Sequence, residues 1–153
     1  MKKFSKKIAI VLAFVLVFSL QAMPVMAATN TKTASSNASI YLTPGSTGTT
    51  NTVSFSFTSL SSTATVSSIK ITAPLSSHSG TAAIIVNSFV ITSPSGTTIT
   101  VPVASGNSAT TSAFNGESAK GTWRMYINCS CPSVGLPNAY GSSTYKPTMT
   151  ITY

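Results

Sequence analysis

Few side chains of this 153-residue protein could take part in acid–base or covalent chemistry. The chain holds one acidic residue, Glu117, one histidine, His78, and two cysteines, Cys129 and Cys131. Hydrolysis by paired carboxylates requires two such groups, and a Ser-His-Asp triad requires an aspartate, which the chain lacks. The remaining hydrolase arrangement would set Glu117 beside His78 and one of the many serines, without a G-x-S-x-G motif. The sequence therefore predicts a protein that is not an enzyme and has no cofactor or metal site.

The two cysteines, Cys129 and Cys131, are separated by one residue in a chain that we expect to be exported. An oxidising compartment favours a disulfide, although a C-x-C bridge closes a small, strained ring that is easily reduced. Three interpretations stay open: a local disulfide that shapes the turn before Pro132, thiols that are free or cross-linked to other chains, and redox or metal chemistry. The third needs basic or metal-ligating neighbours, which do not adjoin the pair.

Residues 1–27 are typical of a secretory signal peptide. Four lysines lie among the first seven residues, residues 8–20 are apolar except for Ser19, and Ala27 ends a short stretch suited to a signal peptidase. The apolar core is shorter than the roughly 20 residues of a membrane span. We expect cleavage after Ala27, which leaves 126 residues (153 minus 27), and secretion from a bacterium by a Sec-type route. No second apolar run follows, so we expect no stable membrane insertion.

The charge that remains after cleavage is small. Five basic residues follow Ala27 against Glu117, so the net charge of the remaining chain is +4 (5 minus 1). The basic residues stand singly, whereas a surface that follows nucleic-acid phosphates needs several cations on one face. We therefore expect no nucleic-acid partner. An extracellular protein or a cell-wall polymer fits better.

The fold is organised around residues 114–127, which contain the only tryptophan, Trp123. Trp123, Met125 and Ile127 alternate with polar or smaller neighbours, which predicts a strand with one buried face. Trp123 is then the expected core anchor, because an indole buries a large apolar surface. The alternative is an exposed aromatic platform for a ligand such as a sugar.

Other segments predict further short strands and turns. Residues 53–57 and 99–103 alternate strictly, and Ser93–Gly96 reads as a turn with Pro94 second and Gly96 fourth, which predicts a hairpin. Pro102 cannot donate a hydrogen bond to a neighbouring strand, so we expect either that its strand lies at a sheet edge or that Pro102 faces outward. We expect residues 28–39 to be a flexible N-terminal segment and residues 40–153 to be a single domain. We expect polar loops at 75–80 and 105–112, and a long irregular segment that follows Pro132 and continues past Gly141 to the final strand at residues 147–153.

Two more patterns complete the expected strands. The doubled serines 67 and 68 shift the alternation of Val66 and Ile69, which predicts a β-bulge, and residues 83–92 predict either one central strand or two pieces that meet at Asn87. No helical pattern of useful length follows Ala27. Short strands joined by Gly, Pro, Ser and Asn turns predict an all-β protein with an antiparallel β-sandwich or jelly roll.

The order of motifs resembles the P domain (P/Homo B) of proprotein convertases and bacterial secreted proteases. SFVITSPSGT (88–97) followed by AFNGESAKGTWRMYI (113–127) carries the resemblance, which covers residues 66–153. It implies a jelly-roll, galactose-binding-domain-like fold and a non-catalytic role beside a protease. The family's structural positions match Pro94 and Gly96 in the turn and Gly121 and Trp123 in the strand.

The sequence also departs from that family. Asn87 and Asn128 stand where the family usually has aspartates, so a calcium site of the family type is not expected here. The remaining 126 residues (153 minus 27) also leave no room for a protease domain, which predicts a free-standing version.

We expect a secreted, non-catalytic β-sandwich module for protein or cell-surface interaction. The alternative is a carbohydrate or cell-wall binding module, which would need exposed aromatic residues gathered on one surface. Two further hypotheses are a small hydrolase that uses His78 and Glu117, and self-assembly through sheet edges that few charges protect. The candidate binding residues are Tyr126, Tyr140 and Tyr145, with Tyr153 as a fourth.

Overall fold

Antiparallel strands account for the regular structure of the computed structural model, which describes residues 27–103, 105–133, 135 and 138–153. The predicted signal peptide lies outside the described residues except for Ala27. Within these ranges no helix is long and apolar enough to cross a membrane. The strands are β1 (Thr29–Thr33), β2 (Ala38–Leu42), β3 (Thr47–Thr49), β4 (Val53–Ser56), β5 (Ser68–Thr72), β6 (Leu75–Gly80), β7 (Ile85–Thr92), β8 (Thr98–Pro102), β9 (Ser108–Thr111), β10 (Thr122–Ser130), β11 (Gly141–Tyr145) and β12 (Thr148–Thr152).

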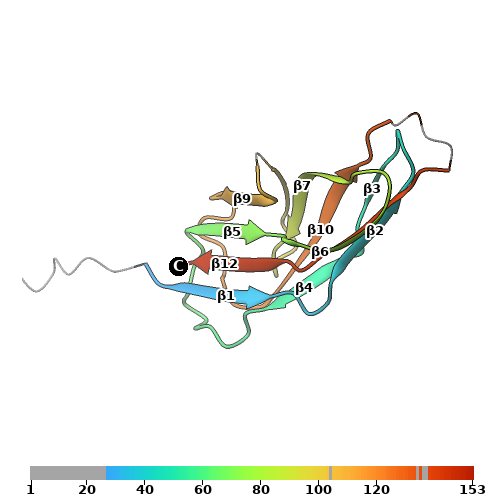
Figure 1. Ribbon diagram of the computed structural model, residues 1–153. Coiled ribbons are helices and arrows are strands. Elements are labelled where there is room, and N and C mark those ends of the chain that lie inside the picture. The colour runs from blue at the N-terminus through green and yellow to red at the C-terminus, as the bar shows by residue number, and fades with distance from the viewer. Residues whose placement is uncertain (1–26, 104, 134, 136–137) are drawn as a thin grey trace, which may run out of the picture.

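One layer, called the long layer here, is made of bent strands. Its two sheets have the orders β1-β12-β5-β9 and β2-β11-β6 (Figure 1). In the chain, β1 continues into β2, β5 continues into β6, and β11 continues into β12, so each of these pairs joins the two sheets. The bends fall at Pro74 and Pro147, which cannot donate a main-chain hydrogen bond. The Ala34 N–H donates to the Pro147 carbonyl at 2.9 Å, and the Lys146 N–H donates to the Pro74 carbonyl at 3.1 Å. These bonds hold the two halves of the long layer together.

The second layer, called the β10 layer here, has the order β3-β10-β7-β8, and β4 also pairs with β10. Each bent strand (β1 with β2, β5 with β6, β11 with β12) is counted once, and so are β3 and β4, which follow each other along β10. Numbered in chain order, the eight strands then give 1-8-3-6 in the long layer and 2-7-4-5 in the β10 layer. This is the strand order of a jelly roll, in which long antiparallel pairs fold over into two packed sheets. The structure thus confirms the predicted all-β, antiparallel jelly-roll β-sandwich.

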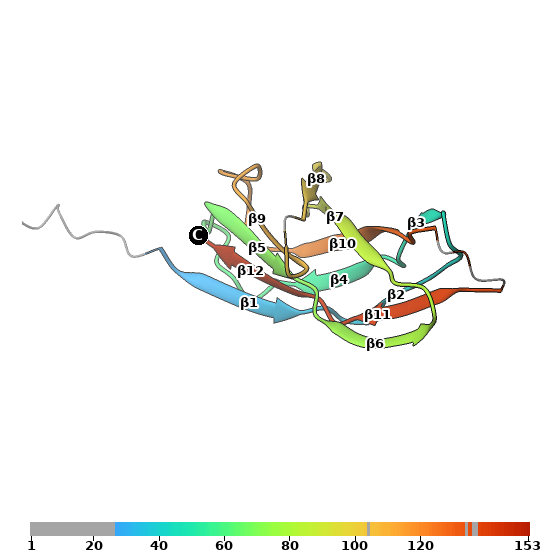
Figure 2. The same cartoon turned by 45° about the horizontal axis from the view of Figure 1, so that its top comes forward.

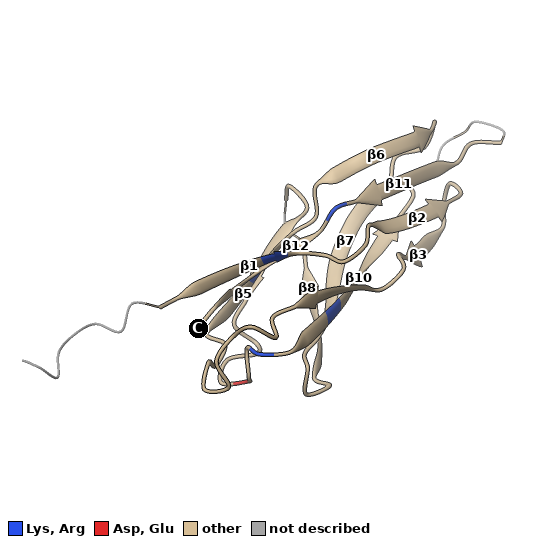
Figure 3. Ribbon diagram, turned by 90° about the horizontal axis from the view of Figure 1, so that it is seen from below, with Lys and Arg blue, Asp and Glu red and all other residues tan. Residues whose placement is uncertain are grey.

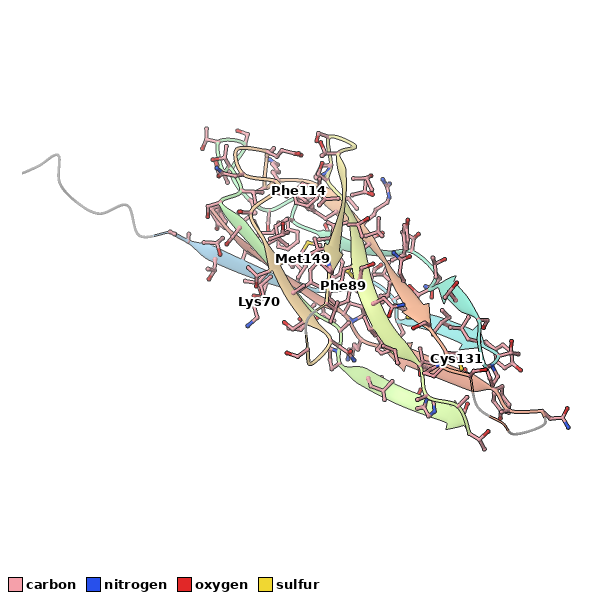
Figure 4. The ribbon with its side chains drawn as sticks, turned by 90° about the horizontal axis from the view of Figure 1, so that it is seen from above. Lys70, Phe89, Phe114, Cys131 and Met149 are labelled. Atoms are coloured by element: carbon pink, nitrogen blue, oxygen red, sulfur yellow. The ribbon has the colours of Figure 1, made fainter. Side chains whose placement is uncertain are left out.

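The core lies between the layers. Figure 4 shows Phe89, Phe114 and Met149 between the sheets, while Lys70 points away from them. Trp123 is fully buried, its ring N–H donates to the Ala119 carbonyl at 3.1 Å, and Phe114 meets it edge-on with ring centroids 5.1 Å apart. The prediction that Trp123 anchors the core is confirmed.

Several local predictions are confirmed as well. The hairpin of β7 and β8 turns at Ser93–Gly96, where the Gly96 N–H donates to the Ser93 carbonyl at 3.0 Å. β8, which carries Pro102, lies at a sheet edge. β7 is a single strand next to β10 whose register shifts beside Asn87. The bulge at residues 67–68 is present, since both serines face Thr152.

Four segments expected to be irregular contain strands instead. Residues 28–39 include β1, which pairs with β12, and the expected loops at 75–80 and 105–112 contain β6 and β9. β11 begins at Gly141 after the long connection. β1, β6 and β9 lie at the edges of their sheets, and every residue of β6 is exposed. An edge strand with little buried surface has no apolar alternation, so its pairing with a neighbour leaves no mark in the sequence.

Candidate functional site

An exposed pair of aromatic rings lies on the outer surface of the sheet β2-β11-β6. The rings of Tyr41 in β2 and Tyr140, the residue before β11, stack with centroids 5.4 Å apart and planes inclined by 21°. Tyr41 is 62% exposed and Tyr140 is 39% exposed. Tyr41 points outward because Ile40 and Leu42, its neighbours in the strand, face the core. Two large rings held together in water are a candidate binding surface.

Two glycines position Tyr140. A Cβ at Gly80 would overlap the Tyr140 carbonyl oxygen and lie 2.9 Å from the Tyr140 ring atom Cδ2, and Gly80 has a φ of +92°. A Cβ at Gly141 would overlap the Ala82 carbonyl oxygen. The Ala82 N–H donates to the Tyr140 carbonyl at 3.0 Å. The chain before β11 is therefore packed closely against the end of β6, which places the Tyr140 ring between β6 and Tyr41.

Hydroxyl groups cover the rest of this surface. The cross-strand partners form two outward rows of three, because paired residues of antiparallel strands point to the same side of the sheet. The Ser39 and Thr144 hydroxyls lie 3.1 Å apart. We call this surface the hydroxyl face; its rows are Tyr41, Ser142 and Ser79, then Ser39, Thr144 and Ser77.

The hydroxyl face is electrically neutral. β2, β6 and β11 contain no Lys, Arg, Asp or Glu, and Figure 3 draws all three strands in tan. The cation nearest in sequence is Lys146, which follows β11 at the bend. Lys120, Arg124 and Glu117 belong to β10 or to the segment before it. Such a surface offers shape, apolar contact and neutral hydrogen bonds, and no attraction between net charges.

The tyrosines predicted from the sequence do not gather in one place. Tyr145 is 1% exposed and lies in the core, where burial raises the pKa of its phenol. Tyr126 is half-buried on the outer side of the β10 layer, opposite the hydroxyl face, and Tyr153 packs partly buried against the core. Tyr140 alone of the four lies on the hydroxyl face. Its partner Tyr41 was missed, although its place between Ile40 and Leu42 in an alternating strand marks it as outward-facing.

His78 and Glu117 lie in different parts of the molecule. His78 Nδ1 lies 2.8 Å from the hydroxyl of Ser143, which is itself buried, in the sheet β2-β11-β6. Glu117 accepts a hydrogen bond of 2.7 Å from the Ser95 hydroxyl, and this bond is the main reason why its pKa is lowered. In Figure 3 the red segment of Glu117 lies at the end of the molecule opposite β6. The geometry therefore removes the proposed hydrolase pair.

The two cysteine thiols are free and buried. β10 runs in extended pairing with β3 to Ser130, and the Cys131 N–H continues it by donating to the Ser46 carbonyl at 2.9 Å. Cys129 and Cys131 therefore both point inward along an extended strand. Same-face neighbours on a strand are about 6.7 Å apart, whereas bridged Cβ atoms lie about 4 Å apart. The candidate local disulfide is absent, and burial raises the pKa of the Cys129 thiol to about 11.

Other candidate sites offer little chemistry. Among the described residues no group of three or more His, Cys, Asp or Glu side chains could hold a metal ion. A shallow cleft of about 510 Å³ at the ends of β7 and β8 is lined in part by Ile85, Asn87, Val103 and Asn107, which do not ionise. The hydroxyl face is therefore the best candidate site in the described part of the chain.

The two segments that carry the resemblance to P domains meet in space. Ser95 binds Glu117, and a Cβ at Gly121 would lie 2.6 Å from the Pro94 side chain, so only glycine fits there. Pro94, Gly96, Gly121 and Trp123 thus have structural positions at the end of the β7–β8 hairpin and in the core.

Comparison with known proteins leaves the family open. No family model and no curated protein matches the chain. The crystal structure of FlhE is similar at 13% identity, with 83% of this chain and 96% of that chain covered and a TM-score of 0.47. A likeness at this level carries no argument about function.

Proposed function

We propose that this protein is an exported, non-catalytic module that attaches to an uncharged partner at the cell surface through the hydroxyl face. The observation that carries the proposal is the composition of that face, in which six neighbouring outward positions all bear hydroxyl groups and none bears a charge. Export is the prediction from residues 1–27. The scattered ionisable groups of the described residues support a role in binding.

The neutral face favours one kind of partner over others. Surfaces that bind nucleic acid or anionic lipid need several cations on one side, and β2, β6 and β11 offer none. Binding through hydroxyl groups and aromatic rings is nearly independent of ionic strength, since salt screens charges only. Attachment that does not change with salt is thus a signature of this proposal.

A second candidate is binding of an extracellular protein, as in protease-associated P domains. It is favoured by β6, an edge strand whose six residues are all exposed and whose outer edge pairs with no other strand in the described part of the chain. An extended segment of a partner could add to such an edge by main-chain hydrogen bonds. The resemblance in residues 66–153 makes a secreted protease the partner to test first.

The experiment measures retention of the purified protein, without residues 1–27, on isolated cell walls and on secreted proteins of the producing organism at low and high ionic strength. Ser142→Glu places a charge in the centre of the hydroxyl face, and the matched control Thr100→Glu places it on exposed β8 of the β10 layer. We expect salt-independent retention on the wall that Ser142→Glu abolishes and Thr100→Glu keeps. Retention by a secreted protease that both variants keep would favour the second candidate. Retention lost at high salt would overturn the proposal.

A further inference from the structure

We propose that Tyr41 and Tyr140 form a stacking subsite for a pyranose ring of a neutral polysaccharide, with the hydroxyls of Ser39 and Ser142 beside it. The inference rests on the function proposed above and adds the ligand class and the residues. It assigns the exposed aromatic pair, which lies outside the buried core, to binding a sugar.

The first argument is the position of the Tyr41 ring. It is 62% exposed, the largest exposed fraction among the large apolar side chains of the described residues. One side of the ring is stacked on Tyr140, so the other is free to take a ligand. The C–H groups on one side of a pyranose ring are apolar and pack flat on an aromatic ring, while its hydroxyls remain at the rim. Tyr is well suited to this contact because it adds a polar tip to an apolar ring.

The second argument is that the pair is held in place before any ligand binds. Tyr140 is fixed by the Ala82 N–H bond to its carbonyl and by its close approach to Gly80, and Tyr41 lies in a regular strand that pairs with β11. A contact surface that is already ordered loses little conformational entropy on binding. A mobile surface aromatic residue would not have this advantage.

The third argument comes from the surroundings. Ser142 is the cross-strand neighbour of Tyr41, and Ser39 lies two residues away on the same side of β2. Hydroxyls both donate and accept hydrogen bonds, as sugar hydroxyls do, so the two surfaces match group for group. A nucleic-acid base could also stack on Tyr41, but its phosphates would find no cation on these strands.

The shape of the site indicates a polymer. The pair lies on the outer side of a sheet, and the cleft near β7 and β8 is lined by other residues. An open surface covers only one side of a sugar, whereas small-ligand sites enclose most of their ligand. Useful affinity must then come from several sugars in a row, for which the second hydroxyl row, Ser39, Thr144 and Ser77, continues the surface.

The test is calorimetric titration of the protein, without residues 1–27, with cello-oligosaccharides and chito-oligosaccharides, and with oligogalacturonate as an anionic comparison. We expect binding of at least one neutral series and none of the anionic one. Tyr41→Ala should weaken binding about tenfold, Tyr41→Phe should keep it, and Tyr126→Ala on the β10 layer should leave it unchanged. Thermal unfolding of Tyr41→Ala should match that of the unmodified protein, because the ring is mostly exposed.

Three results would overturn the inference. Binding of neutral sugars that Tyr41→Ala leaves intact would show that the sugar site lies elsewhere; the retention of Ser142→Glu on cell walls would then decide separately whether the hydroxyl face attaches the module. Absence of binding to both neutral series, together with salt-independent retention on cell walls, would reject the ligand class and leave the module's attachment role intact. A preference for oligogalacturonate would reject the neutral ligand.

Discussion

β6 and β7 follow each other in the chain and are built on opposite principles. All six residues of β6 are exposed, whereas five of the eight residues of β7 are buried. β7 exists because its side chains fill the core between the two layers, and β6 exists because its main chain pairs with β11. The β10 layer therefore contributes much of the core, whereas the outer side of the sheet β2-β11-β6, the hydroxyl face, lies outside the core.

The largest effect that we expect is a difference in stability between a variant in the core and a variant on the hydroxyl face. Trp123→Ala should lower the free energy of unfolding by about 3–5 kcal/mol, because it leaves a cavity in the core and removes the hydrogen bond to Ala119. Tyr41→Ala on the hydroxyl face should change it by less than about 0.5 kcal/mol. Urea denaturation measures both. Equal losses for the two variants would contradict the division between the buried core and the exposed hydroxyl face.

The reactivity of the two cysteine thiols tests whether the core is closed to solvent in the folded protein. Cys129 is buried in the β10 layer and has a pKa raised from 9.0 to about 11, which lowers its thiolate fraction near pH 8 about a hundredfold. We expect iodoacetamide to label Cys129 and Cys131 slowly in the folded protein and rapidly in urea, as followed by mass spectrometry. Rapid labelling without denaturant would show that the core opens at this end of β10.

Two glycines can be compared in the same way: Gly80 at the end of β6 in the long layer, and Gly96 in the turn between β7 and β8 of the β10 layer. Both have positive φ angles, +92° and +97°, so alanine at either position is strained by about 1 kcal/mol. Only at Gly80 would the added Cβ overlap Tyr140, while nothing lies within 4 Å of it at Gly96. Gly80→Ala should therefore cost clearly more stability than Gly96→Ala in urea denaturation. Gly80→Ala should also weaken sugar binding, because it displaces the Tyr140 ring. Equal losses of stability for Gly80→Ala and Gly96→Ala would mean that Gly80 does not hold Tyr140 in place.

The smallest expected effect is a pH dependence from Glu117. Hydrogen bonds, chiefly from Ser95, lower its pKa in the folded state below the ordinary value of 4.5. A carboxyl with a lowered folded pKa stabilises the protein above its unfolded pKa and loses this contribution as the pH falls through the folded pKa. We expect a slight fall in the unfolding free energy below about pH 4.5 that Glu117→Gln lacks. Identical pH profiles for the two proteins would show that the Ser95 bond contributes nothing.

The contrast between strands that fill the core and strands that are mostly exposed also explains which parts of the fold could be predicted from the sequence. Trp123, the hairpin at Ser93–Gly96 and the bulge at residues 67–68 were predictable because core packing and turn chemistry leave apolar alternation, prolines and glycines in the chain. The strands β1, β6, β9 and β11 were not predicted, since their residues are mostly polar and their partners lie far away in the sequence.

The candidate site was harder to predict for a related reason. Tyr145 looked like a surface aromatic residue only while β11 was taken as a loop; within a strand that alternates inward and outward residues it enters the core. Tyr41 and Tyr140 are 99 residues apart (140 minus 41), and only the pairing of β2 with β11 brings them together. No local pattern carries that information.

The most direct test of the central claim, that the hydroxyl face is the binding surface, compares Ser142→Glu with Thr100→Glu for retention on isolated cell walls across a range of ionic strength. We expect the unmodified protein and Thr100→Glu to be retained equally at every salt concentration, and Ser142→Glu not to be retained. Retention of Ser142→Glu equal to that of the unmodified protein would contradict it.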